Sequence, residues 1–343
     1  MDYVRNAWYV AGWSREINKE LKRVTILETD LVMFRSDSNG VVALLDRCPH
    51  KLLPLSMGRR IGDNIQCGYH GLTFNFAGEC VRVPGQDNVP SLASVRKFPV
   101  LERNDIIWVW MGDRALADTS KIIDLPALGA SGWAAHQGDA LHLKANYLNV
   151  AENLCDPAHV SFVHPTTLGN SASEDVPIES RRLEDGTILT WRWVRNGPPV
   201  GFFQKFGGFS GNVDRWHYYY LHLPSTAVID FGSGDSVDQL DETGRDRGVR
   251  IFALHFLTPV NEHYTIDRWM HVRNTALDDP NVANEMDELF RVAFSEDKEI
   301  LEAIDAEERR VRDHRPIRLA IDKGANLYRR EIERLLSAER ANM

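Results

Sequence analysis

Cys48-Pro49-His50 and Cys67-Gly68-Tyr69-His70 are the two short stretches that decide the fold of this chain. Each offers one thiolate and one imidazole, and sixteen residues lie between His50 and Cys67. Two cysteines and two histidines in paired hairpin-like loops favour a [2Fe–2S] cluster in which two imidazoles replace two thiolates on one iron. Gly68 and Gly71 allow the tight backbone bends that such loops require.

A zinc site is the alternative for the same four residues, because two cysteines and two histidines also suit tetrahedral Zn²⁺. Zinc-binding pairs are typically closer together in sequence and lie in small finger-like modules. The sequence therefore favours the iron–sulfur cluster over zinc. The two remaining cysteines, Cys80 and Cys155, have no assigned partner, and we expect both to be buried free thiols.

A second motif lies in residues 151–165, AENLCDPAHVSFVHP, which place Asn153, Asp156, His159 and His164 in a short segment. On an ideal helix the first three share one face. His159 and His164 are about 140° apart on such a helix, so a regular helix cannot direct both at one metal. We therefore expect a widened turn or a helix end between them, and Pro165 favours an end.

Two histidines need a carboxylate to complete the facial triad that leaves open positions for dioxygen on Fe(II). Asp297 is our candidate, because it falls in the middle of the apolar stripe predicted for a helix at 285–306. A carboxylate that faces the core is costly unless it is paired or bound to a metal. Asp297 could instead pair with a buried arginine or cap backbone groups. That stripe comprises Met286, Leu289, Phe290, Ala293, Phe294, Ile300, Leu301 and Ile304, with Glu296 at its edge.

The chain has 343 residues, enough for about two domains, and its formal net charge of -9 disfavours nucleic acids as partners. No stretch is apolar for the roughly 18 residues that a membrane span needs, so no membrane partner and a cytoplasmic location are expected. The glycine-dense segments match neither a dinucleotide-binding nor a phosphate-binding loop, so we expect no NAD or flavin on this chain.

Short β-like runs separated by glycines in the first hundred residues predict a small antiparallel β domain, residues 1–115. A stretch rich in Ala, Asp and Pro at 118–132 resembles a linker. Beyond it, strands at 217–223, 226–231, 250–258 and 264–273 and helices near 147–163 and 281–312 predict an α+β domain, residues 116–343. The acidic, glycine-rich run at 232–249 is expected to be an exposed loop.

Together these motifs resemble the Rieske non-haem iron oxygenases, in particular the branch with the vanillate O-demethylase, dicamba demethylase and toluenesulfonate methyl-monooxygenase types. The likeness extends over nearly the whole chain, including the opening at 5–11, the stretch at 107–113 and Ser295-Glu296-Asp297. One local departure is Cys155-Asp156-Pro157-Ala158, because the O-demethylases have Asp-Leu-Thr or Asp-Leu-Gly before the first histidine. Pro157 predicts a kink or a helix start there. Residues 164–169 are more similar to the toluenesulfonate type.

The resemblance implies a Rieske β domain followed by a helix-grip catalytic domain, an antiparallel sheet with helices. It also implies that Asp156 relays electrons between a cluster histidine and an iron histidine of neighbouring subunits in a homotrimer, with Asn153 beside the iron. The site residues it implies are, for the cluster, Cys48, His50, Cys67 and His70, and, for the catalytic iron, His159, His164 and Asp297.

The function predicted on this basis is oxidation of a methoxy or methyl group of an aromatic acid with O2, with O-demethylation and formaldehyde release favoured. A separate flavin/ferredoxin-type reductase is the expected partner. The alternatives are a methyl or ring hydroxylase of an aromatic acid or sulfonate, a Rieske electron-transfer protein with a ligand-binding domain, and a zinc-bearing interaction protein. His255 and Asp230 are candidate substrate contacts, although either could be an ordinary sheet or surface residue.

Overall fold

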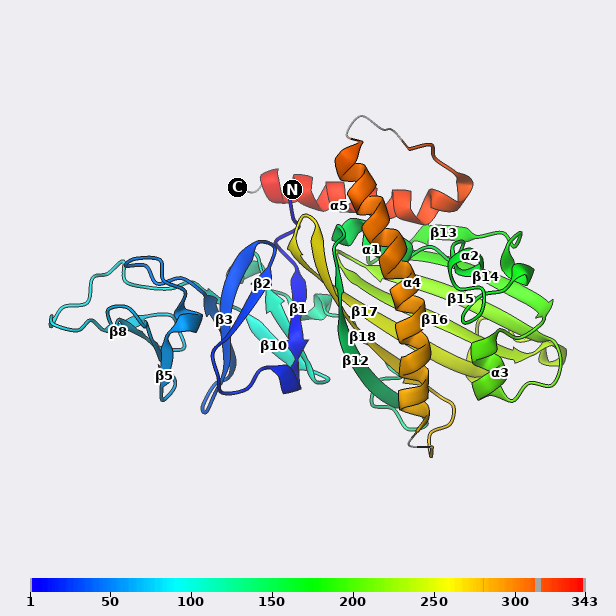
Figure 1. Cartoon of the computed structure of the whole chain (residues 1–343), viewed down its shortest axis with the longest axis horizontal. Coiled ribbons are helices and arrows are strands. Elements are labelled where there is room, and N and C mark those ends of the chain that lie inside the picture. Colours follow the sequence, from blue (N-terminus) through cyan, green and yellow to red (C-terminus); the bar gives the residue numbers. More distant parts are fainter. Residues whose placement is uncertain (1, 280, 312–315, 342–343) are drawn as a thin grey trace. The chain divides into compact units, whose positions relative to one another are not determined.

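The computed structural model describes residues 2–279, 281–311 and 316–341, and it divides into two compact units (Figure 1). The N-terminal unit comprises Met1–Ile122 and Thr258–Asn261, and the C-terminal unit comprises Ile123–Leu257 and Glu262–Met343. Among the described residues, no helix is both long enough and apolar enough to cross a membrane.

The N-terminal unit is built from three small antiparallel sheets, with strand orders β1-β11-β10, β2-β3-β4-β9 and β5-β6-β7-β8. The run at 24–29, which reads as one strand, is divided by a tight turn in which Leu27 and Glu28 have positive φ angles of 51° and 58°. Such a turn matches the twist of the two strands that it joins. The strands are β1 Trp8–Trp13, β2 Lys22–Ile26, β3 Thr29–Ser36, β4 Gly40–Leu45, β5 Arg59–Ile61, β6 Asn64–Gln66, β7 Thr73–Phe74, β8 Cys80–Arg82, β9 Lys97–Phe98, β10 Val100–Arg103 and β11 Ile106–Trp110.

The C-terminal unit is organised around one seven-stranded sheet of order β12-β18-β17-β16-β15-β14-β13. All four strands predicted for this region are present, and they form the middle of the sheet together with β14. The α+β class is therefore confirmed. The strands are β12 Ala134–Leu143, β13 Glu179–Arg182, β14 Ile188–Gly197, β15 Val213–His222, β16 Thr226–Asp235, β17 Val249–Asn261 and β18 Tyr264–Arg273.

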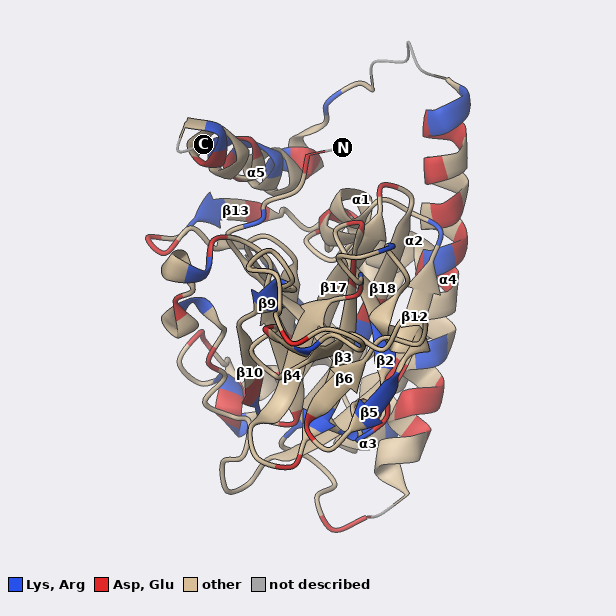
Figure 2. Cartoon of the chain, turned by 90° about the vertical axis from the view of Figure 1, so that its left-hand side faces the viewer, with Lys and Arg blue, Asp and Glu red and all other residues tan. Residues whose placement is uncertain are grey.

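Helix α4 runs across one face of this sheet (Figure 1), and both acidic and basic residues occur along its length (Figure 2). Its buried side presents Met286, Phe290, Ala293, Phe294 and Leu301, as the apolar stripe predicts. Ile300 and Ile304 were wrongly included in that stripe, because they are 45% and 43% exposed. The helices are α1 Tyr147–Asn153, α2 Val160–Val163, α3 Gly201–Gly207, α4 Val282–Arg310 and α5 Lys323–Ala341.

The predicted helix at 147–163 is interrupted. Asn146 caps the start of α1 by accepting the N–H of Leu148 at 2.9 Å, but α1 ends at Asn153 and α2 begins only at Val160. Pro157 lies in the gap, where it cannot donate a helical hydrogen bond and disfavours helical geometry at the residue before it. Asn153, Asp156 and His159 therefore do not share one helical face, contrary to that prediction.

The run at 232–249 is only partly an exposed loop. Strand β16 continues to Asp235, and Ser233, Leu240 and Arg245 in this segment are buried. Arg245 pairs with the buried carboxylate of Asp230 at 2.5 Å, which secures the segment to the sheet. The prediction of an exposed loop relied on the acidic, glycine-rich composition of the run and did not account for these three buried residues.

Candidate active site

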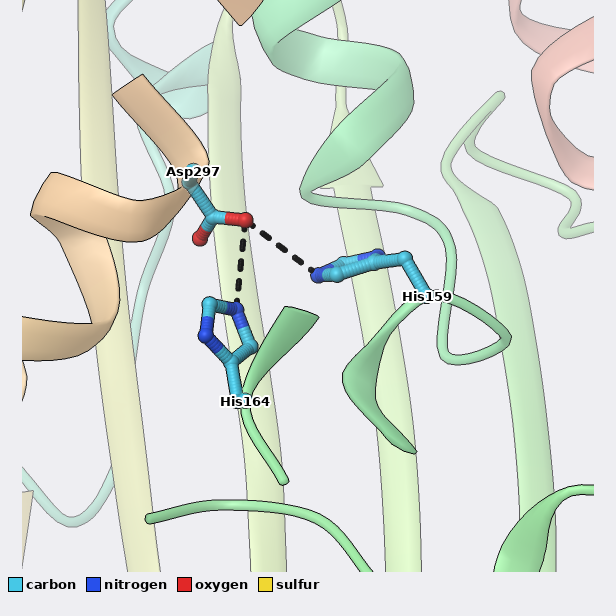
Figure 3. Close-up of side chains that lie close together, drawn as sticks. All are labelled: His159, His164 and Asp297. Atoms are coloured by element: carbon cyan, nitrogen blue, oxygen red, sulfur yellow. Dashed lines mark ion pairs between the residues drawn. The ribbon is translucent and has the colours of Figure 1, made fainter. Parts of the chain in front are cut away.

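His159, His164 and Asp297 come together in the C-terminal unit, as the sequence predicts (Figure 3). One carboxylate oxygen of Asp297 lies 3.5 Å from Nε2 of His159 and 3.2 Å from Nε2 of His164. One candidate ligand atom of each residue lies within 4.8 Å of the others. Three convergent ligands of these types suit the two-histidine, one-carboxylate triad of non-haem iron.

The short helix α2 explains how two histidines five residues apart reach one point. His159 immediately precedes α2 and His164 immediately follows it, with Pro165 next, so the expected helix end is present. The chain then turns back against α2, where Gly169 donates its N–H to the carbonyl of His164 at 2.9 Å. A Cβ atom at Gly169 would lie 2.3 Å from the carbonyl oxygen of Val160, so only glycine permits this close approach.

Three polar side chains surround the triad. Oε2 of Glu296 lies 2.7 Å from Nδ1 of His164, and the side-chain amide of Asn153 donates to Asp297 at 3.0 Å. A carboxylate that orients a ligating histidine is a common outer partner of metal sites. Asp156 approaches Nδ1 of His159 to 3.6 Å, which is longer than a hydrogen bond. Glu296, predicted to lie only at the edge of the apolar stripe, is therefore a further functional candidate.

The charges of the triad favour a bound cation. Burial acts to raise the pKa of Asp297, but the hydrogen bond from His164 and the charges of both histidines outweigh it and lower that pKa. Burial acts to lower the pKa of His164, but Asp297 and Glu296 outweigh it and raise that pKa. An ionised carboxylate beside two imidazoles, in a site where His164 is 1% exposed, fits a divalent metal ion.

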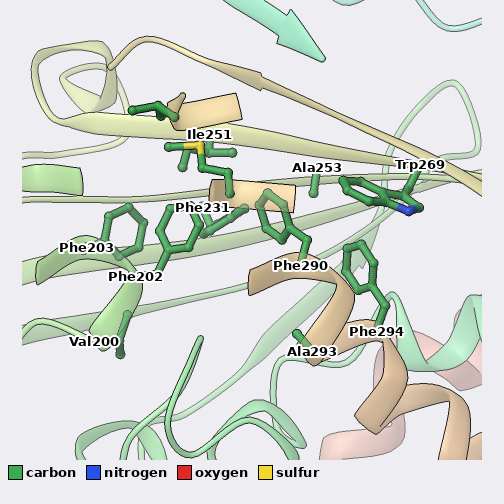
Figure 4. Close-up of a cluster of buried hydrophobic side chains, with 12 residues drawn as sticks. Val200, Phe202, Phe203, Phe231, Ile251, Ala253, Trp269, Phe290, Ala293 and Phe294 are labelled. Carbon is green, nitrogen blue, oxygen red and sulfur yellow. The ribbon is translucent and has the colours of Figure 1, made fainter. Parts of the chain in front are cut away.

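A cavity adjoins the triad, and most of its wall is apolar. Phe231, Phe290, Phe294 and Ala253 come from the buried cluster that α4 and α3 form against the sheet (Figure 4). Phe203 of α3 also belongs to this wall, and neither α3 nor this role was predicted. An apolar cavity beside a few convergent polar groups is the usual form of a small-molecule site.

The two candidate substrate residues lie on opposite faces of the sheet. His255 lines the cavity beside the triad; its Nδ1 lies 2.7 Å from Asp267, and its Nε2 is buried without a hydrogen-bond partner in the described structure. Asp230 lines a separate hollow, because its neighbours Ile229 and Phe231 face the triad and side chains alternate along a strand. The prediction that Asp230 faces the metal pocket is therefore wrong.

His217 and Tyr219 on β15 also line the cavity, although neither was predicted as a site residue. The available signal was the alternation in the predicted strand at 217–223, where residues two apart face the same side. That alternation did not reveal which side faces the metal.

The four predicted cluster ligands lie in two loops of the N-terminal unit that have matching backbone hydrogen bonds. Cys48 donates its N–H to the carbonyl of Leu53 at 2.9 Å and accepts the N–H of Leu52 at 3.0 Å. Cys67 repeats the pattern with Leu72 at 2.8 Å and Gly71 at 3.1 Å. Gly71 has a φ of 75°, so the tight bend expected at this glycine is present.

In these loops the thiols lie inside and the imidazoles outside. Cys48 and Cys67 are buried, whereas His50 and His70 are exposed with ring centroids 4.6 Å apart. Burial raises the pKa of the Cys48 thiol and the neighbouring Cys67 raises it further, while backbone N–H groups of His50 and Lys51 act to lower it. Two adjacent thiols supported by backbone donors fit sulfur ligands of an iron cluster.

The other two cysteines differ in burial. Cys155 is buried, with burial raising its pKa to about 12, whereas Cys80 is only half-buried. Both are free thiols in the described structure, so the prediction for Cys155 is confirmed and the burial of Cys80 was overestimated.

Both candidate sites lie in segments of the chain that match known domain families. Residues 7–98 match the Rieske [2Fe–2S] domain, and residues 143–338, more than half of the chain, match the vanillate O-demethylase oxygenase C-terminal domain. This chain belongs to the Rieske non-haem iron oxygenases. The Rieske oxygenase is 35% identical over 341 residues to the toluene-4-sulfonate monooxygenase iron–sulfur subunit of Comamonas testosteroni, with 98% of each chain covered.

The Rieske oxygenase is also 35% identical to the oxygenase component of dicamba O-demethylase from Stenotrophomonas maltophilia, covering 99% of this chain and 100% of that relative. It matches the crystal structure of dicamba monooxygenase with non-heme iron and dicamba at a TM-score of 0.83, with 31% identity and 100% of both chains covered. The chain is thus an oxygenase component of a Rieske monooxygenase that uses a [2Fe–2S] cluster and a non-haem iron. The predicted family, the enzyme class, the [2Fe–2S] cluster and the non-haem iron are confirmed.

Proposed function

We propose that this Rieske oxygenase oxidises a methoxy or methyl group of an aromatic acid, with O-demethylation and formaldehyde release as the favoured reaction. The observation that carries the proposal is the cavity beside the triad. Phe203, Phe231, Phe290 and Phe294 supply a wall suited to an aromatic ring, and His159, His164 and Asp297 line the same cavity. A ring held there places a substituent next to the metal ligands.

We assign the iron to His159, His164 and Asp297, and the cluster to Cys48, His50, Cys67 and His70. When bound, the cluster supplies single electrons and the mononuclear iron activates dioxygen for insertion of one oxygen atom into a C–H bond. The protein's contribution is to hold the ligands, exclude bulk water from the apolar cavity and orient the substrate.

Asp156 and Asn153 are assigned supporting roles. The carboxylate of Asp156 is the nearest acid to Nδ1 of His159 in the described structure, at 3.6 Å, which supports a role in electron relay and in orienting that imidazole. Asn153 donates to Asp297 at 3.0 Å and so fixes the direction in which this carboxylate points. His255 is retained as a substrate contact because its buried Nε2 has no partner in the described structure.

The assembly and organisation follow the family likeness. We propose a homotrimer that receives electrons from a separate flavin/ferredoxin-type reductase, with a Rieske domain at 1–115 and a catalytic domain at 116–343. A cytoplasmic location remains a prediction.

The test measures oxygen uptake and formaldehyde release by the iron-loaded protein, supplied with a flavin/ferredoxin-type reductase and a panel of methoxylated and methylated aromatic acids. Formaldehyde in step with oxygen supports O-demethylation. A hydroxymethyl or phenolic product without formaldehyde would replace it with the hydroxylase alternative. Asp297→Ala is the control, expected to retain the cluster absorption while losing iron and product; full activity in this variant would contradict the iron assignment.

A further inference from the structure

Two arginines are buried on adjacent strands of the catalytic sheet. Arg192 on β14 is 2% exposed and Arg215 on β15 is 0% exposed. Within the described residues each guanidinium makes one hydrogen bond: Arg192 donates to the carbonyl of Ser173 and Arg215 to the side chain of Asn170, both at 2.8 Å. Both acceptors are neutral, so neither guanidinium charge is compensated by them.

The remaining guanidinium donors are unsatisfied. Nε and Nη2 of Arg192, and Nε and Nη1 of Arg215, are buried without a hydrogen-bond acceptor in the described part of the chain. Burial lowers the pKa of Arg192, and the charge of Asp156 opposes that effect without a hydrogen bond between the two groups; for Arg215, burial and the positive charge of Arg192 both lower the pKa. Burial lowers the pKa of Arg215 to about 10, so it still carries its charge at neutral pH.

Neither arginine is among the described residues that line the cavity, but both lie on the same face of the sheet as His217, which does line it. His217 lines the cavity and lies directly opposite Arg192 in the β14–β15 pairing, while Arg215 is two residues from His217 on the same strand face. Nδ1 of His217 is likewise buried without a partner in the described structure. Burial holds the pKa of His217 well below its usual value, and both arginines lower it further, so this imidazole is neutral and can still donate one N–H.

We propose that His217, with Arg192 and Arg215 beside it on the same face of the sheet, marks the anion-recognition end of the cavity, and that the three residues bind the carboxylate or sulfonate of the aromatic substrate. The proposal rests on the aromatic-acid function proposed above and specifies which residues select the acid. Buried charges in proteins are normally paired, and two like charges without a counterion are costly. An anion with several acceptor oxygens would satisfy the free donors of both guanidinium groups.

Arg250, in the same unit, differs from Arg192 and Arg215 because it is paired with an acid. Arg250 is also largely buried, but it contacts the carboxylate of Asp230 at 2.6 Å, on the opposite face of the sheet from the cavity. Arg250→Met is therefore a matched control, in which an arginine with an internal partner is removed away from the triad.

The experiment measures equilibrium binding by calorimetry to the holoenzyme without reductase, so that no turnover is required. The probes are 4-methoxybenzoate and 4-methylbenzenesulfonate, each compared with its neutral amide, 4-methoxybenzamide or 4-methylbenzenesulfonamide. We expect Arg215→Met and Arg192→Met to weaken binding of the anions about 10- to 100-fold and of the amides less than about threefold. Arg250→Met should leave the ratio of anion affinity to amide affinity unchanged for both probe pairs.

Unfolding of the unliganded variants separates binding from a structural role. Because Arg192 and Arg215 have no counterion among the described residues, their replacement by methionine should leave the denaturation midpoint unchanged or raise it, whereas Arg250→Met should lower it. Should Arg215→Met not fold, Arg215→Lys keeps the charge but loses the planar fork, and an intermediate loss of anion affinity is expected.

Equal losses for acid and amide, wild-type affinities in both variants, or absence of anion binding would overturn the inference. Formaldehyde release that does not depend on the arginines would leave the proposed function standing while this inference fails. Arginine-dependent anion binding without any oxygenated product would support the inference and refute the proposed function.

Discussion

Removing the carboxylate of Glu296 should weaken the hold on the catalytic iron without disturbing the cluster. Oε2 of Glu296 lies 2.7 Å from Nδ1 of His164, and this contact sets the orientation and tautomer of the imidazole whose Nε2 faces Asp297. Losing an outer partner of this kind typically lowers metal affinity about 10- to 100-fold. The Glu296 side chain is 33% exposed, so solvent screens its charge and we expect the lower end of that range for Glu296→Gln. A tenfold loss corresponds to about 1.4 kcal/mol.

The assay is anaerobic titration of the iron-depleted protein with Fe(II) in competition with a chelator, while visible absorption reports the cluster. Glu299→Gln is the matched control, because Glu299 is an exposed acid on the same helix. Glu296→Gln should raise the Fe(II) dissociation constant about tenfold over the control. If the two variants bind Fe(II) within twofold of each other, the reasoning about His164 is refuted.

Three further predictions address relay, packing and pH. Asp156→Ala should keep wild-type iron and cluster content yet abolish coupled product formation, since this carboxylate lies near His159 without a hydrogen bond to it; undiminished turnover would contradict the assignment. Met286→Ala removes a 0%-exposed side chain and should cost about 2–5 kcal/mol of unfolding free energy in denaturant titration, whereas Val292→Ala, 48% exposed on the same helix, should cost much less. Burial lowers the pKa values of His217, His222 and His271, so below about pH 6.5 the unfolded chain binds protons that the folded chain does not. The urea concentration at the midpoint of unfolding should therefore be lower at pH 5.5 than at pH 7.5. An equal midpoint at the two pH values would contradict this prediction.

Local sequence was sufficient to predict the family of this protein and its two iron cofactors. Metal ligands are recognisable because sulfur, imidazole and carboxylate groups occur at short, specific spacings, as in Cys48-Pro49-His50 and in the His159 to His164 segment. The burial of Asp297 could also be predicted, because a helix with an apolar stripe must turn that stripe toward the core.

Side-chain environments that depend on strand register could not be predicted from the sequence in the same way. Residues alternate between two faces of a strand, and the sequence alone does not say which face meets α4. Asp230 was therefore placed on the wrong face, and the cavity roles of His217 and Tyr219 were missed.

What the sequence by itself determined is the family and the α+β class, together with a candidate set of metal ligands, because each depends on residue type and on spacing along a short stretch. Only the tertiary structure decided which distant residues meet. Glu296 contacts His164 across 132 residues, and Asn153 contacts Asp297 across 144. The burial of Arg192 and Arg215 without a charged partner likewise depends on tertiary packing, because their hydrogen-bond acceptors, Ser173 and Asn170, belong to a separate segment of the chain. No local sequence pattern specifies that packing.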